Sequence, residues 1–275
     1  MSLFTIDEKK CKRDGICVAE CPMQIIEMKD AKSLPTPTAD AAQRCIKCGH
    51  CVAVCPHGAF THAMMNAGDF PPMKKEFALS PERAEHFLRS RRAVRTYQDK
   101  SIEREKLQKL IEIARYAPTG SNSQLVSWLA INSRPEVARL AKMVADMMRE
   151  LVKAKNPFAI SYRLDRIVTA WENGIDLISR GAPALVVAHG PREYGLSHVD
   201  CTSALVYLDL AAPTFGLGTC WAGFIMLAYL QWPPLQQALK IPEGQVAQGI
   251  MMVGYPRYKY HRLVPRNQPK IEWRM

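Results

Sequence analysis

Seven of the nine cysteines in this 275-residue chain lie within its first 55 residues. Four of them follow the spacing C-x2-C-x2-C-x3-C-P, and these are Cys45, Cys48, Cys51 and Cys55. Thiolates are the soft ligands that iron–sulfur clusters prefer, and in such runs the first three cysteines hold one cluster while the fourth holds a neighbouring one. A zinc site is the competing interpretation, but a structural zinc ion is usually held by two separate C-x2-C pairs. The spacing therefore predicts iron–sulfur chemistry.

A second, incomplete copy of this motif lies 34 residues upstream. Its cysteines are Cys11, Cys17 and Cys21, and Asp14 stands where the second cysteine would be. If each copy lends its last cysteine to the other cluster, two ligand sets follow. The first cluster would be held by Cys11, Asp14, Cys17 and Cys55, and the second cluster by Cys45, Cys48, Cys51 and Cys21.

Asp14 leaves the type of the first cluster open. A carboxylate is a harder ligand than a thiolate, so Asp14 would bind the fourth iron weakly or leave a three-iron cluster with an open corner. The alternative is that Asp14 faces solvent and holds no iron. Residues 1–65 as a whole resemble a bacterial two-cluster ferredoxin, and some archaeal ferredoxins carry Asp at this position, which favours Asp14 as a ligand. We expect a 4Fe-4S second cluster and a first cluster that interconverts between 4Fe-4S and 3Fe-4S forms.

The charge of the chain is unevenly distributed. The 37 Lys and Arg residues exceed the 26 Asp and Glu residues by 11, and residues 1–65 contribute only +1 of this surplus, as 8 minus 7. Two oxidised clusters bound by seven thiolates would bring that segment to about −2. No nucleic-acid fold signature accompanies the basic surplus, so nucleic-acid binding is not expected. The 48% of hydrophobic residues excludes a disordered protein.

The N-terminal residues contain no apolar segment typical of a signal peptide, and we expect a cytoplasmic protein. Residues 210–239 carry no formal charge and exceed the length of a membrane span. Because glycines and prolines interrupt this stretch, it is predicted to form a buried helix, a turn and a second helix instead of a membrane span.

The rest of the chain must position the group that accepts electrons from the clusters. Residues 66–80 have the composition of a linker between a cluster domain at 1–65 and a second domain at 81–275. N-cap and capping-box patterns at Ser80 and Ser133 each predict the start of a helix. Apolar periodicity predicts further helices over about 102–116 and 199–212, and strands over 126–131, 184–188 and 250–253. These elements indicate an α+β or α/β layered domain.

Three stretches of the second domain resemble, in order and spacing, the signature stretches of the nitroreductase family. They are Ser90–Tyr97, Ala117–Gln124 and Gly216–Gly223. Together with residues 254–262 they extend the resemblance over nearly all of 81–275. The glycine-rich stretch reads G-x-G-x4-G and is predicted to follow a helix, so it is not a dinucleotide fingerprint. The resemblance implies an α+β fold and FMN bound at the interface of a homodimer.

The FMN phosphate suits the planar, permanently charged guanidinium of arginine. By the family pattern, Arg91 would hold the phosphate, Arg95 would face the N1/O2 edge of the ring, and Arg92 completes the cluster. The family's serine in this motif is Ala93 here. Arg262, with Lys259 as a weaker candidate, would add a contact to the phosphate from the C-terminal segment.

The resemblance assigns two further groups to the flavin site. A loop from the other subunit would lie along the ring, and its residues are Pro118, Thr119, Gly120, Ser121, Asn122 and Gln124. The backbone N–H groups of Ala222 and Gly223 would face N5 and O4 of the ring, where glycine permits close approach. Cys201 and Cys220 are expected to be buried and unreactive, and no catalytic acid or base is identified.

The sequence therefore predicts an FMN-dependent oxidoreductase of the nitroreductase type. Electrons would pass from two iron–sulfur clusters to FMN and then to an organic acceptor, which the family implies to be nitroaromatic or quinone-like. The donor could be a ferredoxin, another iron–sulfur protein or NAD(P)H. One alternative is an electron-transfer module that relays electrons between a partner protein and FMN without its own small substrate. Another is a flavin-consuming or dehalogenating member of the family.

Overall fold

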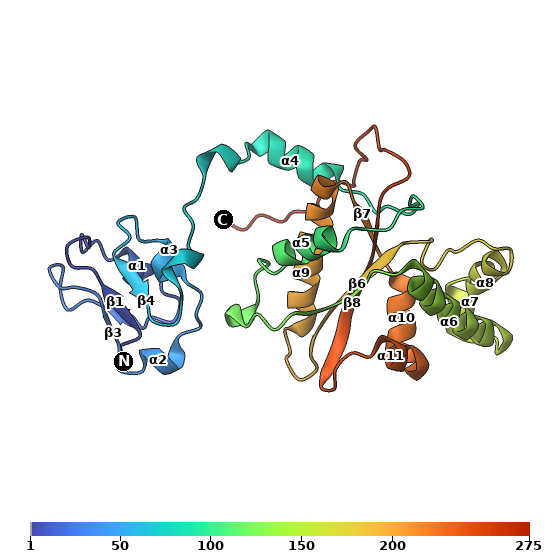
Figure 1. Cartoon of the computed structure of the whole chain (residues 1–275), viewed down its shortest axis with the longest axis horizontal. Coiled ribbons are helices and arrows are strands. Elements are labelled where there is room, and N and C mark those ends of the chain that lie inside the picture. The colour runs from blue at the N-terminus through green and yellow to red at the C-terminus, as the bar shows by residue number, and fades with distance from the viewer. Residues whose placement is uncertain (1) are drawn as a thin grey trace. The chain divides into compact units, whose positions relative to one another are not determined.

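The computed structural model describes residues 2–275, which divide into two compact units (Figure 1). The first unit consists of the chain up to Ala78 together with the short segment Ser121–Ser123. The second unit comprises Leu79–Gly120 and Gln124–Met275. The division at Ala78 falls inside the predicted linker 66–80, which holds the short 3-10 helices η1 (Ala67–Asp69) and η2 (Lys75–Phe77).

The first unit consists of short elements arranged as two copies of one pattern. Its strands are β1 (Phe4–Ile6), β2 (Ile26–Glu27), β3 (Thr36–Pro37) and β4 (Phe60–His62), and its helices are α1 (Ile16–Glu20), α2 (Ala41–Arg44) and α3 (His50–Ala53). β1 pairs antiparallel with β4, and β2 pairs antiparallel with β3. Left-handed backbone at Arg13, Gly15 and Gln24 recurs 34 residues later at Lys47, Gly49 and Gly58. The backbone therefore repeats with the period of the cysteine motifs.

The second unit is built around a four-stranded sheet in the order β5-β6-β8-β7 with every neighbouring pair antiparallel. The strands are β5 (Ser127–Ile131), β6 (Ala184–Pro191), β7 (Gly218–Trp221) and β8 (Gln245–Gly254). Adjacent residues of a strand face opposite sides of the sheet, and both sides of β6 and β8 are buried. Val186 and Val187, for example, belong to different hydrophobic clusters.

Helices cover both faces of this sheet, as Figure 1 shows. One face packs against α9 (Ser197–Ala211), which in turn packs against α5 (Arg104–Ala114). The other face packs against α6 (Arg134–Lys153) and α10 (Gly223–Gln231), and α8 (Leu164–Glu172) and α11 (Pro233–Leu239) pack on α6. The remaining helices are α4 (Pro81–Ser90) and α7 (Pro157–Ser161). The predicted α+β class is confirmed.

Two predicted helix starts are confirmed by their caps. The Ser80 hydroxyl accepts a hydrogen bond from the Arg83 N–H at 3.3 Å, and the Ser133 hydroxyl accepts one from the Glu136 N–H at 3.4 Å. These bonds satisfy backbone donors that the first turn of a helix leaves unpaired.

The uncharged stretch 210–239 differs from its prediction. The end of α9 is followed by the 3-10 helix η4 (Ala212–Phe215), and strand β7 then lies between it and α10. The prediction of a helix, a turn and a helix was therefore wrong at β7, which has only four residues and is flanked by glycines. A Cβ at Gly218 would lie 2.3 Å from Val94 Cγ2, so close strand packing requires glycine there. We find no helix within residues 2–275 that is both long and apolar enough to cross a bilayer.

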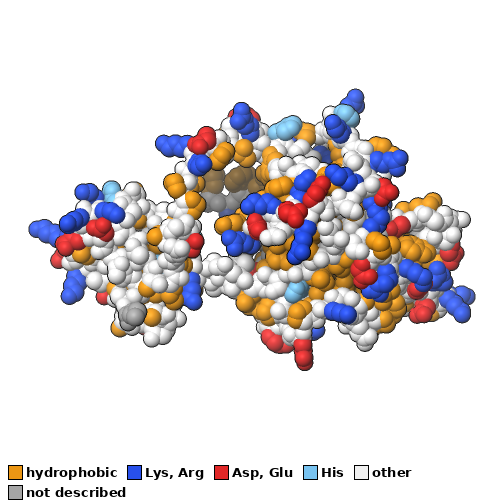
Figure 2. Space-filling model, viewed as in Figure 1, with side chains coloured by type: hydrophobic (Ala, Val, Ile, Leu, Met, Phe, Trp, Pro, Cys, Tyr) orange, Lys and Arg blue, Asp and Glu red, His pale blue; other side chains and the backbone are white. Residues whose placement is uncertain are grey.

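The basic surplus of the chain does not form one patch on the face shown in Figure 2. Lys and Arg side chains on that face are scattered, with Asp and Glu side chains among them. That face therefore presents no continuous basic surface of the kind that a nucleic-acid backbone contacts.

Candidate cofactor sites

The cysteines of the first unit surround two cavities. One is lined by the four residues predicted for the second cluster, which are Cys21, Cys45, Cys48 and Cys51. The other is lined by the four residues predicted for the first cluster, which are Cys11, Asp14, Cys17 and Cys55. The fold thus brings together both predicted ligand sets, including the cysteine that each motif lends to the other.

The shape of these sites suits a cluster better than a single ion. Within residues 2–275, no three His, Cys, Asp or Glu side chains converge closely enough to hold one metal ion. A tetrahedral zinc site needs its ligand atoms within about 2.3 Å of one point. Each cysteine set instead lines the wall of a space between its side chains, and a multi-iron core is held by thiolates placed around it in this way.

Burial affects the protonation of the cysteine ligands. Desolvation raises the pKa of the Cys51 thiol to about 12, and it also raises the pKa of Cys17. Buried thiolates are stable only beside positive charge, and cluster iron supplies such charge. The donor set therefore fits iron–sulfur clusters.

Asp14 lies beside the first cavity, where its carboxylate has two neighbours. Its Oδ1 accepts a hydrogen bond from the Ile16 N–H at 3.3 Å, and its Oδ2 lies 3.6 Å from His57 Nε2. His57 lines the same cavity, whereas the exposed His50 lies 3.2 Å from Glu20 Oε1. This position is compatible with Asp14 as a ligand, which stays a prediction.

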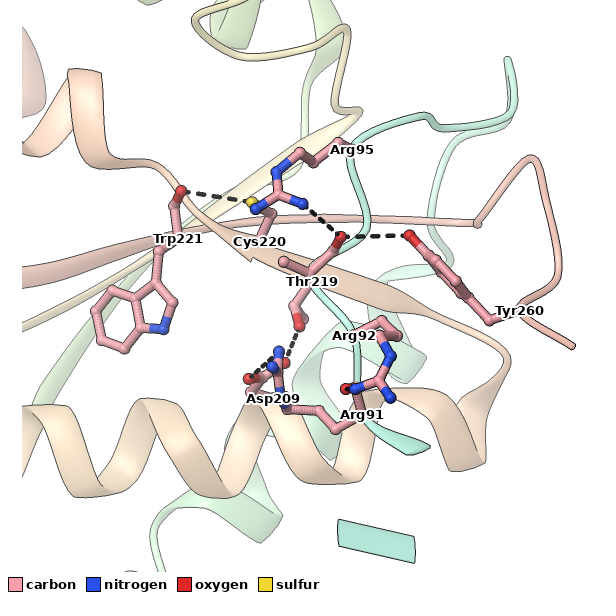
Figure 3. A network of polar contacts seen from close by, with 9 residues as sticks. Arg91, Arg92, Arg95, Asp209, Thr219, Cys220, Trp221 and Tyr260 are labelled. Atoms are coloured by element: carbon pink, nitrogen blue, oxygen red, sulfur yellow. Dashed lines mark hydrogen bonds and ion pairs between the residues drawn. The ribbon is translucent and has the colours of Figure 1, made fainter. Parts of the chain in front are cut away.

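The arginine motif of the second unit lies along the edge strand β7. The Val94 N–H donates to the Thr219 carbonyl at 2.8 Å, and Ala93 forms a parallel bridge with Thr219. Arg91 Nη1 lies 3.4 Å from Asp209 Oδ2, and the Thr219 hydroxyl donates to the same carboxylate (Figure 3). The predicted phosphate ligand Arg91 therefore has an anionic partner within the chain, which sequence reasoning missed.

Arg92 has guanidinium atoms without a partner. Its Nη1 donates to the Arg91 carbonyl, but its Nε and Nη2 are buried and form no hydrogen bond to any residue in 2–275. Buried guanidinium donors without an acceptor are costly, so an anion in contact with them would stabilise the fold. These atoms fit the phosphate of FMN.

A cavity of about 440 Å³ lies at this position, and four arginines line it. They are Arg89, Arg91, Arg92 and Arg266. The C-terminal residues at this cavity are Val264, Pro265 and Arg266, whereas the predicted Lys259 and Arg262 do not line it, and all five residues are exposed. Arg266 was missed because the segment after β8 is irregular and gives no periodic signal that would show which of its basic residues lines the cavity.

Arg95 is exposed, and its Nη1 donates to the Ala93 carbonyl at 3.5 Å. The Tyr260 hydroxyl donates to the same carbonyl at 3.4 Å, which ties the C-terminal segment to the arginine motif (Figure 3). Burial raises the pKa of Cys220, and it raises that of Cys201 to about 11, as expected of unreactive thiols.

The predicted flavin loop is held by residues that the sequence did not assign to it. The Gly120 N–H donates to Asp200 Oδ1 at 3.1 Å, and the Tyr194 hydroxyl donates to the Gly120 carbonyl at 3.1 Å. The Gln124 N–H donates to the Thr119 hydroxyl oxygen at 3.1 Å, while Pro118 is exposed.

Left-handed backbone occurs at three residues of this loop, which are Ser121, Asn122 and Gln124. Non-glycine residues rarely adopt this conformation, and such strain is concentrated at functional sites.

The two backbone N–H groups predicted to face the flavin, at the end of β7, differ in whether they are available to a ligand. The Ala222 N–H donates to the Ile250 carbonyl at 2.9 Å, so it continues the pairing with β8 and is not available to a ligand. That part of the prediction was wrong, because sheet register decides which amides remain free. Gly223 begins α10, and a Cβ there would meet no atom within 4 Å, so the space in front of it is open.

The arginine motif and the loop lie at opposite edges of the sheet. Residues 91–97 lie beside β7, which is the edge strand on one side of the sheet. The loop leads into β5, which is the edge strand on the other side. One copy of the second unit therefore presents the two halves of the predicted flavin site at different places.

Comparison with known proteins identifies both parts of the chain. Residues 88–255 match the nitroreductase family, and residues 9–60 match the 4Fe-4S dicluster domain. A protein of Archaeoglobus fulgidus named as an NADH dehydrogenase/NAD(P)H nitroreductase is 24% identical over 172 residues, which are 61% of this chain and 82% of that protein.

Solved structures show the same fold. A nitroreductase with bound FMN from Desulfitobacterium hafniense DCB-2 has a TM-score of 0.56 and 23% identity, and the match covers 70% of this chain and 100% of that one. A nitroreductase with bound FMN from Bacteroides fragilis has a TM-score of 0.52 and 22% identity, covering 68% of this chain and 94% of that one. The chain thus belongs to the nitroreductase family and is an oxidoreductase of the nitroreductase type, with a 4Fe-4S dicluster domain before the family domain.

Proposed function

We propose that this protein is an iron–sulfur flavoprotein that takes up electrons at its two cysteine-ligated sites and delivers them from an FMN site to an organic acceptor of the nitroaromatic or quinone class. FMN supplies one- and two-electron exchange when bound, and iron–sulfur clusters supply one-electron exchange. The observation that carries the proposal is the presence, in one chain, of two cavities lined by the predicted cluster residues and of a third cavity lined by Arg92, which has unpartnered guanidinium donors.

In this proposal the arginine-lined cavity binds the FMN phosphate. Arg92 contributes the buried Nε and Nη2 donors, Arg266 reaches the cavity from the C-terminal segment, and Arg91 is oriented by Asp209. Arg95 remains our candidate for the N1/O2 edge of the ring, and Gly223 for its N5 side. A guanidinium near N1 stabilises the negative charge that a flavin acquires on reduction.

We further propose that two chains form each FMN site. The loop residues Pro118–Gly120 lie at the opposite edge of the sheet from the arginines, so a second copy must supply them if both groups contact one flavin. Such reciprocal sharing is natural for a two-fold dimer, in which each chain contributes the same two surfaces.

At the cluster sites we propose a 4Fe-4S second cluster and a first cluster that has either Asp14 on its fourth iron or a 3Fe-4S core. Replacing Asp14 with Cys should give a first cluster that keeps four irons during mild oxidation, because thiolate binds iron more strongly than carboxylate. EPR before and after oxidation measures this, and equal loss of iron in Asp14→Cys and the parent protein would exclude Asp14 as the weak ligand. Free thiols require a reducing compartment before cluster assembly, which supports a cytoplasmic location.

The function is tested with two matched proteins under anaerobic conditions. The parent protein should contain two clusters and one FMN per chain by iron, sulfide and flavin quantitation. A variant with Cys11→Ser, Cys17→Ser, Cys45→Ser and Cys48→Ser should keep FMN but lose its clusters. Reduced ferredoxin should then reduce nitroaromatic or quinone acceptors through the parent protein only.

The outcomes separate the proposed routes. Equal turnover of both proteins with a one-electron donor would show that the clusters are not on the electron path. Turnover of both proteins with NAD(P)H would instead identify nicotinamide as a donor to the flavin itself. Reduction of a partner protein without turnover of small acceptors would favour an electron-transfer module.

A further inference from the structure

His62 is a buried imidazole beside the second cluster site, and neither cysteine motif includes it. It ends β4, its exposed fraction is 4%, and it lines the same cavity as Cys21, Cys45, Cys48 and Cys51. Its Nε2 lies 3.5 Å from Cys45 Sγ, within hydrogen-bonding distance for sulfur.

The other ring nitrogen fixes the proton on His62. The Met64 N–H donates to His62 Nδ1 at 3.2 Å, so Nδ1 must carry a lone pair. A neutral imidazole with an acceptor at Nδ1 has its hydrogen at Nε2. The Nε2–H group therefore points at Cys45 Sγ as a donor.

The first cluster site lacks an equivalent donor at the repeat-related position. Residue 62 corresponds to Met28 across the 34-residue repeat, and a thioether has no hydrogen to donate. The imidazole that does line the first cavity, His57, lies beside the Asp14 carboxylate. The Lys47 N–H also donates to Cys45 Sγ, at 3.4 Å, so His62 adds a side-chain donor to a sulfur that already has a backbone one.

We infer that His62 donates a hydrogen bond to the Cys45 thiolate and thereby raises the reduction potential of the second cluster. The inference rests on the proposed iron–sulfur function. A one-electron reduction makes the cluster and its sulfur ligands more negative, so an N–H···S bond is stronger in the reduced state than in the oxidised state. The donor therefore stabilises the reduced form, and its removal lowers the potential.

Two variants of His62 distinguish the effect of losing the N–H donor from the effect of changing the shape of the side chain. His62→Met places the repeat-related residue at this position and removes the donor, whereas His62→Gln keeps an N–H group near the place of Nε2. EPR-monitored redox titration of each holoprotein measures both clusters, and the first cluster serves as the internal reference. In His62→Met the ratio of reduced to oxidised second cluster at a fixed potential should fall about tenfold, which is about 59 mV for a one-electron couple. His62→Gln should retain most of the parent value.

Nitrogen-15 labelling of histidine gives a second measurement on the unaltered protein. The reduced second cluster should show a hyperfine coupling to one histidine nitrogen, and the coupling should be absent in His62→Met. An unchanged potential in His62→Met, an equal shift in both clusters, or no nitrogen coupling in the parent protein would overturn the inference. A parent protein without iron would instead overturn the proposed function itself.

Discussion

Arg91 and Asp209 form an ion pair in the second unit, with Nη1 and Oδ2 3.4 Å apart, although 118 positions separate them in the sequence. Asp209 is 6% exposed and also accepts a hydrogen bond from the Thr219 hydroxyl. Desolvation raises the pKa of Asp209, while Thr219 and Arg91 act in the opposite direction. Arg91 is therefore held in place by the fold before any phosphate binds.

Replacing Arg91 with Ala should destabilise the second unit by about 2 kcal/mol at neutral pH, because the Asp209 carboxylate is left buried without its cation. The loss of Arg91 raises the pKa of Asp209 further above its ordinary value of 3.8. The loss of unfolding free energy arises only when the Asp209 carboxyl is ionised. It is therefore present above the pKa of Asp209 in the folded variant and disappears as the pH falls through that pKa. Urea unfolding of the FMN-free protein at several pH values measures it.

Tryptophan fluorescence reports this transition cleanly, since all five tryptophans lie in the second unit. The double variant Arg91→Ala/Asp209→Asn should regain most of the lost stability at neutral pH, because no buried charge remains unpaired. A destabilisation of Arg91→Ala that is independent of pH would contradict this account.

Replacing Arg92 with Leu should weaken FMN binding by about 2 kcal/mol, or more than tenfold, since two charge-assisted hydrogen bonds to the phosphate are lost. Riboflavin has the same ring without the phosphate, so its affinity should change little. Fluorescence titration with both flavins gives the comparison. An equal loss for FMN and riboflavin would place Arg92 away from the phosphate.

Mixed dimers test whether two chains build each flavin site. Arg92→Glu disables the phosphate end, and Gly120→Val distorts the loop, because a Cβ at Gly120 would lie 2.3 Å from Leu196 Cδ1 and 2.6 Å from the Tyr194 hydroxyl. Neither homodimer should bind FMN. A purified heterodimer with one variant chain of each kind has one site with both parts intact, and it should bind one FMN. Heterodimers without any FMN would show that each site lies within one chain.

Replacing Cys21 or Cys55 with Ala tests the exchange of ligands between the two motifs. Cys21→Ala should impair the second cluster, whose other ligands lie in the later motif, and Cys55→Ala should impair the first. EPR and iron quantitation of each variant distinguish the two clusters. Damage confined to the cluster of the variant's own motif would mean that the ligands are not exchanged.

The cluster sites were largely predictable from the sequence, because their ligands lie within short motifs whose spacing directly limits the geometry. A run of four cysteines and its 34-residue repeat were enough to give both ligand sets that the fold brings together. The helix starts at Ser80 and Ser133 were predictable for the same reason, since an N-cap acts within one turn.

The flavin half depended on contacts between distant residues, and there only the tertiary structure decided. Sheet register pairs the Ala222 N–H with the Ile250 carbonyl, and strand packing against Val94 makes β7 from a glycine-rich stretch that looked like a turn. Helix α9 brings Asp209 to Arg91, and the irregular C-terminal segment brings Arg266 to the cavity that Arg91 lines. The sequence by itself thus determined which chemistry this protein carries, because ligand type and close spacing are local properties. Which side chains and amides remain available for that chemistry is decided by long-range pairing, which forms only when the sheet does.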